Sequence, residues 1–197
     1  MSLIASTSST TNYEPIPAGS HVARCVSIVD LGTQTTEYQG ETKENHKVRI
    51  TFETPLETKV FKEENGEQPH LISREFTVSF HPKASLRQFV ESWFGKKMTK
   101  EEETGFNLLE LLGKEALINV VHNESNGKTY ANIAGVSPLA KGMTCPEQVN
   151  QSIVFDIDSW DQAVYDNMPE WLQDKIMASP EAQARFDGFA QAEEELV

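Results

Sequence analysis

The sequence contains little cysteine and no long apolar run. Its two cysteines, Cys25 and Cys145, form neither a CxxC pair nor a Cys/His ligand pattern. Such sparse thiols predict neither a disulfide framework nor a zinc site, and favour reduced cysteines in a cytoplasmic protein. No stretch approaches the roughly 18 apolar residues of a membrane span. The opening MSLIASTSSTTN lacks the charged and apolar regions of a signal peptide, so we expect no membrane partner.

The sequence also lacks the short motifs of common catalytic sites. It has no GxSxG elbow, no GxxxxGK[ST] phosphate loop and no HExxH motif. The acidic series Asp156, Asp158 and Asp161 lacks the glycine and closing glutamate of a calcium loop. Capping of a helix explains such residues better than metal binding does. We therefore expect a protein that is not an enzyme, with no catalytic residues, no metal and no cofactor.

Basic residues are a minority, 17 against 30 acidic ones, which gives a formal net charge of −13. The acidic excess is concentrated at the C-terminal end. Residues 156–197 contain 11 acidic and two basic side chains, whereas the preceding 155 residues contain 19 and 15. Acidity argues against a nucleic-acid partner, because binding depends on Lys and Arg near phosphates. A nearly balanced body with an acidic tail weakens that objection.

Hydrophobic patterns predict a mainly β fold with α-helices. Strands are predicted at residues 21–34, 43–53, 71–81, 115–122 and 128–138, the first breaking near Gly32. Residues 55–70 are expected to form a long polar loop. The i, i+3, i+4 spacing in KASLRQFVESWFG predicts a helix that ends at Gly95. Thr99 and Glu102 then resemble a capping box, before a short helical piece that ends at Gly113.

This order of three strands, a helix and two strands is that of an OB fold, a small five-stranded barrel. We expect an OB-fold barrel followed by a short-helical acidic C-terminal region. The predicted division is a disordered N-terminus at 1–13, the barrel at 14–145, and an acidic helical extension and tail at 146–197. Within the extension, IVFDID predicts another strand, and short helices are predicted in WDQAVYDNM, PEWLQDKIM and PEAQARFDGF, the first capped by Ser159.

At this point the chain resembles the phage- and prophage-encoded single-stranded DNA-binding proteins of OB fold. The resemblance rests on DLGTQ at 30–34, KVRITFE at 47–53, REFTVSFHPKASLRQFVESWFGK at 74–96, FNLLELLGKEALINVVH at 106–122 and YANIAGVSPLAKG at 130–142. It implies a non-catalytic, sequence-tolerant protein that coats single-stranded DNA during replication or recombination in the cytoplasm of a bacterial host. It also implies an acidic tail that recruits replication or recombination proteins. The tail here lacks the Gly/Pro/Gln linker and terminal Phe of the commonest bacterial form.

Binding single strands requires cations for phosphates and exposed rings on which bases stack. In KENHKVRITFE, strand alternation places Val48 and Phe52 on one face and Lys43, Lys47 and Arg49 on the other. This basic row is the main predicted phosphate site, and an ordinary solvated strand face is the alternative. Secondary phosphate candidates are Arg24, Lys59, Lys62, Arg74 and Lys128.

The predicted stacking residues are Tyr38, Phe61 and Tyr130. Two of them have structural alternatives. Phe61 would pack its loop against the barrel, and Tyr130, which shares strand parity with Val136, would belong to the core. Trp160 and Trp171 are expected either to dock the C-terminal helices or to form a homodimer contact.

The alternative function is an OB-fold protein-interaction module, or a phage structural or assembly subunit, that does not bind nucleic acid. It stays open because OB barrels host many functions, so that the fold alone cannot choose between them.

Overall fold

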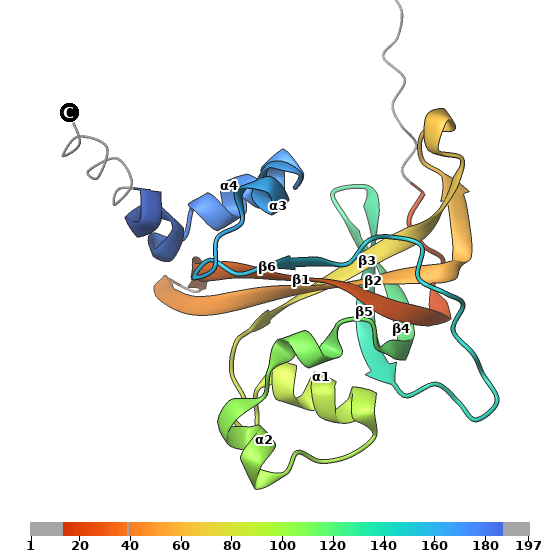
Figure 1. Cartoon of the computed structure of the whole chain (residues 1–197), viewed down its shortest axis with the longest axis horizontal. Helices are drawn as coiled ribbons and strands as arrows, with labels where there is room; N and C mark the ends of the chain where they lie inside the picture. Colours follow the sequence, from red (N-terminus) through yellow and green to blue (C-terminus); the bar gives the residue numbers. More distant parts are fainter. Residues whose placement is uncertain (1–13, 39, 187–197) are drawn as a thin grey trace, which may run out of the picture.

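The protein is mainly β, with helices on both sides of one mainly antiparallel sheet (Figure 1). The computed structural model describes residues 14–38 and 40–186, apart from the side chain of Tyr38. The predictions for residues 1–13 and for the last part of the tail, 187–197, lie outside these ranges. The strands are β1 (Gly19–Tyr38), β2 (Glu41–Val60), β3 (Glu67–Thr77), β4 (Glu115–Ser125), β5 (Lys128–Ser137) and β6 (Ile153–Phe155).

The five long strands follow the predicted order along the chain, but the sheet is open. They pair in the order β3-β2-β1-β4-β5, and β6 adds a short parallel pair to β1. Within the described residues, no backbone ladder joins the edge strands β3 and β5. Instead, Nη1 of Arg74 on β3 donates to the carbonyl of Ile133 on β5 at 3.0 Å. A side chain thus occupies a gap that backbone pairing would narrow to about 4.8 Å, so the prediction of a closed barrel is not confirmed.

The sequence pattern predicts that the first strand breaks near Gly32, but β1 does not break there. It continues to Tyr38, with register shifts against β2 between Cys25 and Ser27 and between Asp30 and Gly32. Gly32 has a φ of +64°, a backbone conformation that allows a bulge at this position while the strand continues. Because of these bulges, β1 pairs with β4 through residues 19–24 and with β6 through residues 27–29.

The predicted polar loop at 55–70 is a long hairpin instead. β2 runs to Val60 and β3 starts at Glu67, and the short 3-10 turn η1 (Glu63–Asn65) connects them. A register shift between Thr54 and Thr58 accommodates Pro55, which cannot donate a ladder hydrogen bond. The charges of this segment therefore lie on an exposed two-stranded ribbon.

α1 (Ser85–Phe94) confirms the predicted helix and covers the main core. It buries Leu86, Phe89, Val90 and Trp93, and it ends at Gly95, whose φ is +64°. The Phe52 ring of β2 packs against Trp93 with a centroid distance of 5.0 Å. α2 (Lys100–Gly105) begins with the predicted capping box of Thr99 and Glu102, and the 3-10 turn η2 (Leu108–Leu111) follows.

The described part of the C-terminal extension is a docked unit with its own core. It comprises β6, α3 (Gln162–Asp166), α4 (Glu170–Met177) and a helical segment that runs from 180 to 186, the last described residue. α3 is capped by Asp161 rather than by Ser159, because Asp161 Oδ1 accepts from the backbone N–H groups of residues 163 and 164. The second core contains Val29, Leu31, Phe155, Ile157, Met168, Leu172, Ile176 and Ala182.

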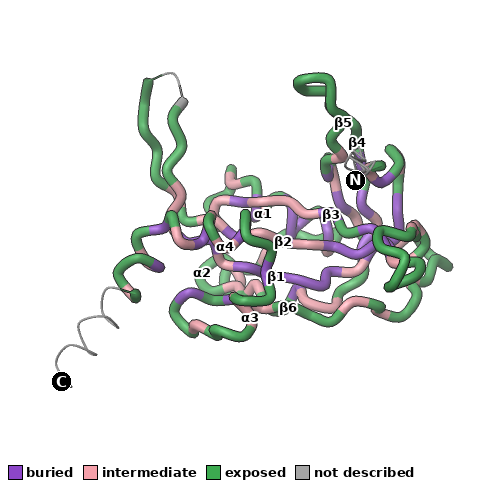
Figure 2. Tube along the Cα trace, turned by 90° about the horizontal axis from the view of Figure 1, so that it is seen from above, coloured by how far each residue is buried: buried purple, intermediate pink, exposed green. Residues whose placement is uncertain are grey.

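Trp160 confirms the prediction that it docks the extension. Its ring lies 4.9 Å from Phe155, 4.7 Å from Tyr165 and 5.1 Å from Phe186, measured between centroids. Figure 2 shows that the buried stretches run through the middle of β1 and β2, whereas the hairpin tips are exposed. The extension lies on the side of the sheet opposite α1 (Figure 1).

Candidate nucleic-acid interface

A cleft of about 760 Å³ lies between the sheet and the C-terminal extension. We call it the β-face cleft. Strands β1, β2 and β3 form its floor, and residues 150–154 with α3 and α4 form its walls. Its volume falls within the range of roughly 300–1,000 Å³ that is usual for ligand pockets. The lining combines apolar and hydroxyl side chains, among them Val29, Thr51, Leu71, Ser73, Met168 and Leu172.

Arg49 and Trp171 meet at this cleft. The guanidinium carbon of Arg49 lies 4.7 Å from the centroid of the Trp171 ring, a cation–π geometry. Arg49 Nη1 donates to Glu75 at 3.2 Å, and Lys175 Nζ of α4 donates to both oxygens of the same carboxylate at 2.8 and 2.7 Å. Trp171 nevertheless remains 52 % exposed. The cleft therefore contains a half-exposed indole ring, that of Trp171, next to the guanidinium of Arg49, which is itself paired with the carboxylate of Glu75.

A buried carboxylate fixes one wall of the cleft. Glu53 of β2 is fully buried and accepts hydrogen bonds from the backbone N–H groups of Val149 and Asn150, at 3.0 and 2.9 Å, and from Asn150 Nδ2 at 2.9 Å. A buried charge of this kind is stable only when such donors surround it. Residues 148–152, which we call the strap, are thereby attached to the sheet.

The predicted basic row follows the predicted alternation but does not form one continuous surface. Val48 and Phe52 are buried, whereas Lys43 is exposed and Lys47 and Arg49 are half-buried. Lys43 lies at the β1–β2 tip, 3.9 Å from Glu41. Across the described ranges, Lys47 has no ion pair. Of the three cations, only Arg49 lines the cleft, and there it is covered by α4.

Three of the secondary cations connect segments of the fold. Arg24 donates to the carbonyls of Gly113 and Pro146 and to Glu115, at 2.8–3.0 Å. Arg74 joins β3 to β5 through the bond to Ile133. Lys59 Nζ donates to Glu14 at 3.2 Å.

The remaining two secondary cations lie on hairpins. Lys62 is exposed at the end of the β2–β3 ribbon, and Lys128 is exposed at the start of β5. The structure therefore does not bring the eight predicted cations together into one site.

The predicted stacking residues also lie apart. Tyr38 ends β1, and its side chain lies outside the described part of the chain. Phe61 is 39 % exposed and packs against His70 with a centroid distance of 5.0 Å. Tyr130 is 48 % exposed, so its assignment to the core was wrong. The β4–β5 hairpin that carries Tyr130 projects to the same side of the body as the β1–β2 hairpin (Figure 2).

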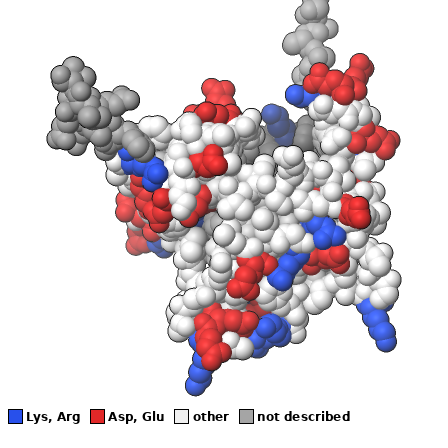
Figure 3. Space-filling model, viewed as in Figure 1, with Lys and Arg blue, Asp and Glu red and all other residues white. Residues whose placement is uncertain are grey.

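Charges of both signs are interspersed on the face of the molecule that Figure 3 shows. On the face shown in Figure 3, acidic and basic side chains alternate with neutral ones. Ion pairs account for much of this mixing, such as those of Arg87 with Glu91 and Glu103. Nucleic-acid binding by an extended cationic surface would require separated charges. The cleft is therefore a better candidate site than a basic face.

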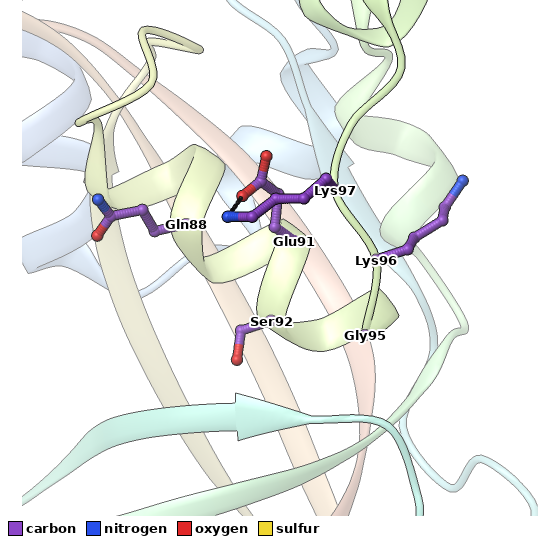
Figure 4. Close-up of a pocket in the computed structure, with 6 residues that line it drawn as sticks. All are labelled: Gln88, Glu91, Ser92, Gly95, Lys96 and Lys97. Carbon is purple, nitrogen blue, oxygen red and sulfur yellow. Dashed lines mark hydrogen bonds and ion pairs between the residues drawn. The ribbon is translucent and has the colours of Figure 1, made fainter.

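A second hollow, of about 280 Å³, lies at the C-terminal end of α1 (Figure 4). Lys97 points toward the buried Glu91 and donates to it at 2.6 Å, while Lys96 and Gln88 point away. This bond from Lys97, together with bonds from Arg87 and the backbone N–H of Met98, lowers the pKa of Glu91 to about 2 even though burial raises it. Glu91 is therefore satisfied by these groups, which connect α1 to the chain that follows it.

His46 connects the sheet to the extension through two carboxylates. Its Nε2 lies 2.7 Å from Asp30 Oδ1, and its Nδ1 lies 3.6 Å from Glu181. Thr33 donates to Glu181 from both its backbone N–H and its hydroxyl, at 2.9 and 2.5 Å. The carboxylate of Glu181 therefore fastens the 180–186 helical segment to β1.

Sequence reasoning did not identify Trp171 as a site residue, nor did it identify Glu53 and Glu75, whose hydrogen bonds hold the strap and Arg49 in place at the cleft. Glu75 could have been found, because a β2–β3 register fixed by Phe52 and Ile72 places it directly opposite Arg49. Glu53 gives no local signal, since it shares the outward parity of Arg49 and its hydrogen-bond partners lie in the distant strap.

Comparison with known proteins assigns no family to the chain, because no family model and no curated protein matches it. Over residues 14–38 and 40–186, no group of three or more His, Cys, Asp or Glu side chains is placed to hold a metal ion. None of the helices in those ranges combines the length and apolarity needed to cross a membrane.

Proposed function

We propose that the chain is a non-catalytic, sequence-tolerant single-stranded DNA-binding protein that acts in phage DNA replication or recombination. The strand order β3-β2-β1-β4-β5, with α1 between β3 and β4, supports this proposal, because an OB fold that is open between β3 and β5 would have the same order. OB folds bind oligonucleotides on the face of their second and third strands and on the loops 1–2 and 4–5. In this proposal, the β-face cleft and the two projecting hairpins correspond to that face and those loops.

The contact between Arg49 and Trp171 is the observation that carries the proposal. Sequence-tolerant binders of single strands combine a cation with exposed aromatic rings, each stacked base contributing about 1–3 kcal/mol. Trp171 supplies a half-exposed ring at a cleft, and Arg49 lies against that ring. Lys43 on one hairpin, and Lys128 and Tyr130 on the other, extend the path on which a strand would lie.

The acidic terminus has a separate proposed role. Acidic residues at 187 and 193–195 follow the docked extension in sequence. We assign to them the recruitment of replication or recombination proteins, in the cytoplasm of a bacterial host cell. Negative charge at this end also opposes non-specific approach of phosphates.

The test is a titration of labelled oligo-dT, followed by fluorescence anisotropy at several salt concentrations. We expect saturable binding at low salt, weaker binding to a duplex of equal length, and a linear log–log salt dependence with a slope of about −0.7 per phosphate neutralised. If the full chain shows no affinity for oligo-dT at the lowest salt concentration, the proposal is wrong.

One observation favours the second candidate, an OB-fold protein-interaction or phage assembly module. Large apolar side chains at the cleft are exposed, with Leu71 at 48 %, Ile153 at 43 % and Trp171 at 52 %. Exposed apolar groups that gather in one place mark protein contacts as well as ligand sites. A homodimer contact through Trp171 would use the same surface, and the oligo-dT titration separates these functions from the first.

A further inference from the structure

The two cations at the β-face cleft are already paired with one carboxylate. Glu75 lies between Arg49 and Lys175, with bonds of 2.7–3.2 Å, so three charged groups leave one net positive charge. Phosphate binding gains its free energy from cations that release condensed counterions. A cation that is already paired with a carboxylate contributes little of this gain. The electrostatics of the cleft therefore give the phosphate backbone only a small gain.

The walls of the cleft fit the chemistry of a nucleobase. A base has two apolar faces and a polar edge, and Val29, Leu71 and Leu172 supply apolar surface on several sides. On the floor, the hydroxyls of Thr51 and Ser73 lie 2.9 Å apart and share one hydrogen bond. Each hydroxyl has two acceptor lone pairs and one donor, so the pair retains capacity to bond the edge of a base.

Trp171 differs from the other two tryptophans in having a half-exposed ring, contacted by Arg49, and an unused donor. Trp93 is buried and donates from Nε1 to the carbonyl of Glu115 at 2.7 Å. Trp160 lies in an aromatic cluster and donates to Gln162 at 3.0 Å. Within the described residues, Trp171 Nε1 donates to no protein group. Leu172 and Ile176 form the buried side of α4, so the helix does not need Trp171 for its packing against the core.

We infer that the β-face cleft is a binding site for unstacked nucleobases, that Trp171 of the C-terminal extension is its stacking platform, and that phosphates remain outside. The inference rests on the proposed single-strand binding and specifies which part of the strand is recognised. The volume suits roughly one or two bases, to judge by ordinary ligand pockets. Because α4 supplies the platform, the extension belongs to the binding site.

An abasic oligonucleotide separates bases from phosphates. Labelled oligo-dT and an abasic strand of equal length carry the same charges, and both are titrated against the full chain. We expect the abasic strand to bind about 10- to 100-fold more weakly, because stacking of the bases is lost. Equal affinity for the two strands would overturn the inference while leaving single-strand binding intact. Binding of neither strand would instead overturn the proposed function.

Variants of Trp171 provide a second, spectroscopic readout. Trp93 is buried and Trp160 is packed, so quenching of tryptophan fluorescence by oligo-dT is expected to come from Trp171. Trp171→Phe should abolish the quenching yet keep affinity within about threefold, whereas Trp171→Ala should lower affinity about tenfold or more. Quenching that persists in Trp171→Phe would place the bases elsewhere.

Filling the cleft provides a matched pair of variants. Ala163 of α3 is exposed and lines the cleft, whereas Ala184 is exposed on the 180–186 helical segment and does not. Ala163→Leu should reduce oligo-dT affinity about fivefold or more, and Ala184→Leu should leave it unchanged. Equal thermal unfolding midpoints would show that both variants are folded. Unchanged affinity in Ala163→Leu as well as in Trp171→Ala would overturn the inference.

Discussion

Gly32 of β1 lies directly against Ser179 of the C-terminal extension. A Cβ atom at position 32 would lie 2.5 Å from both Cβ and Oγ of Ser179 and 2.9 Å from Cδ1 of Ile157. Ser179 is itself fixed, because its hydroxyl donates to the carbonyl of Ile176 at 2.7 Å and accepts from the N–H of Ala182 at 3.2 Å. This contact joins the extension to the bulge of β1.

The close approach predicts that Gly32→Ala is strongly destabilising. The added methyl group overlaps Ser179 and also strains a residue whose φ is +64°, so we expect a loss of about 2–4 kcal/mol in the free energy of unfolding. Gly127→Ala is the matched control, because Gly127 has a φ of +71° but a methyl group there would meet no atom within 4 Å. It should cost about 1 kcal/mol. Urea unfolding measures both, and equal losses would contradict the packing role.

Local patterns predicted most of the fold where one face of an element is buried. The alternation at Val48 and Phe52 and the stripe that ends at Gly95 indicated the correct strand and helix, because burial of one face imposes the period of the element. The predicted strand break at Gly32 was wrong, because a glycine with a positive φ can occupy a bulge within a strand as well as a break in the chain. Local patterns did not predict that the sheet stays open, because that depends on how β3 and β5, which lie far apart in sequence, meet through contacts such as the bond from Arg74 to Ile133.

The candidate site was harder to predict than the fold. Alternation placed Arg49 on the outer face correctly, but it could not show that α4, more than a hundred residues later, covers that face. The alternation of side chains shows which face of a strand each residue occupies, but it does not show which distant segments pack on that face. The binding role of the basic row stays a prediction, and the position of Trp171 required the tertiary structure.

Glu53 predicts a variant that frees the strap. Glu53→Ala leaves the N–H groups of Val149 and Asn150 without their acceptor, so we expect a loss of about 1–3 kcal/mol in stability. The amide hydrogens of these two residues should lose protection, which hydrogen exchange measures directly. Glu53→Gln retains one acceptor oxygen and should lose less. Unchanged protection in Glu53→Ala would show that the strap is held by other contacts.

Lys47 and Arg49 should respond differently when each is replaced with alanine. Over the described ranges Lys47 has no ion pair, so it can neutralise a phosphate, and Lys47→Ala should flatten the salt slope of oligo-dT binding by about 0.7. Arg49 is paired with Glu75 and supports Trp171, so Arg49→Ala should leave the slope nearly unchanged and lower the affinity. Anisotropy titrations at several salt concentrations distinguish the two effects. A flattened slope for Arg49→Ala would show that Arg49 contacts phosphate.

Glu91 predicts a pH dependence of stability. Its pKa is lowered from 4.5 to about 2, chiefly by the bond from Lys97, so the folded protein binds this proton less readily than the unfolded chain. The stabilisation is complete above pH 4.5 and is lost as the pH falls toward 2. Glu91→Gln should therefore unfold at a midpoint that varies less over this range than that of the parent protein. Glu110→Gln, which changes an exposed carboxylate without an ion pair in the described part of the chain, is the control.

Two truncations separate the docked extension from the acidic terminus. Removing residues 187–197 deletes four acidic side chains and leaves the second core whole, so the unfolding midpoint should stay the same. Oligo-dT binding should tighten at low salt, because less negative charge opposes the phosphates, and the difference should shrink as salt screens it. Removing residues 156–197 instead uncovers Val29 and Leu31 and deletes Trp171, so both stability and affinity should fall. Tighter binding by the longer deletion would mean that α4 blocks the site, whereas a fall in both quantities is the result expected if α4 forms one of its walls.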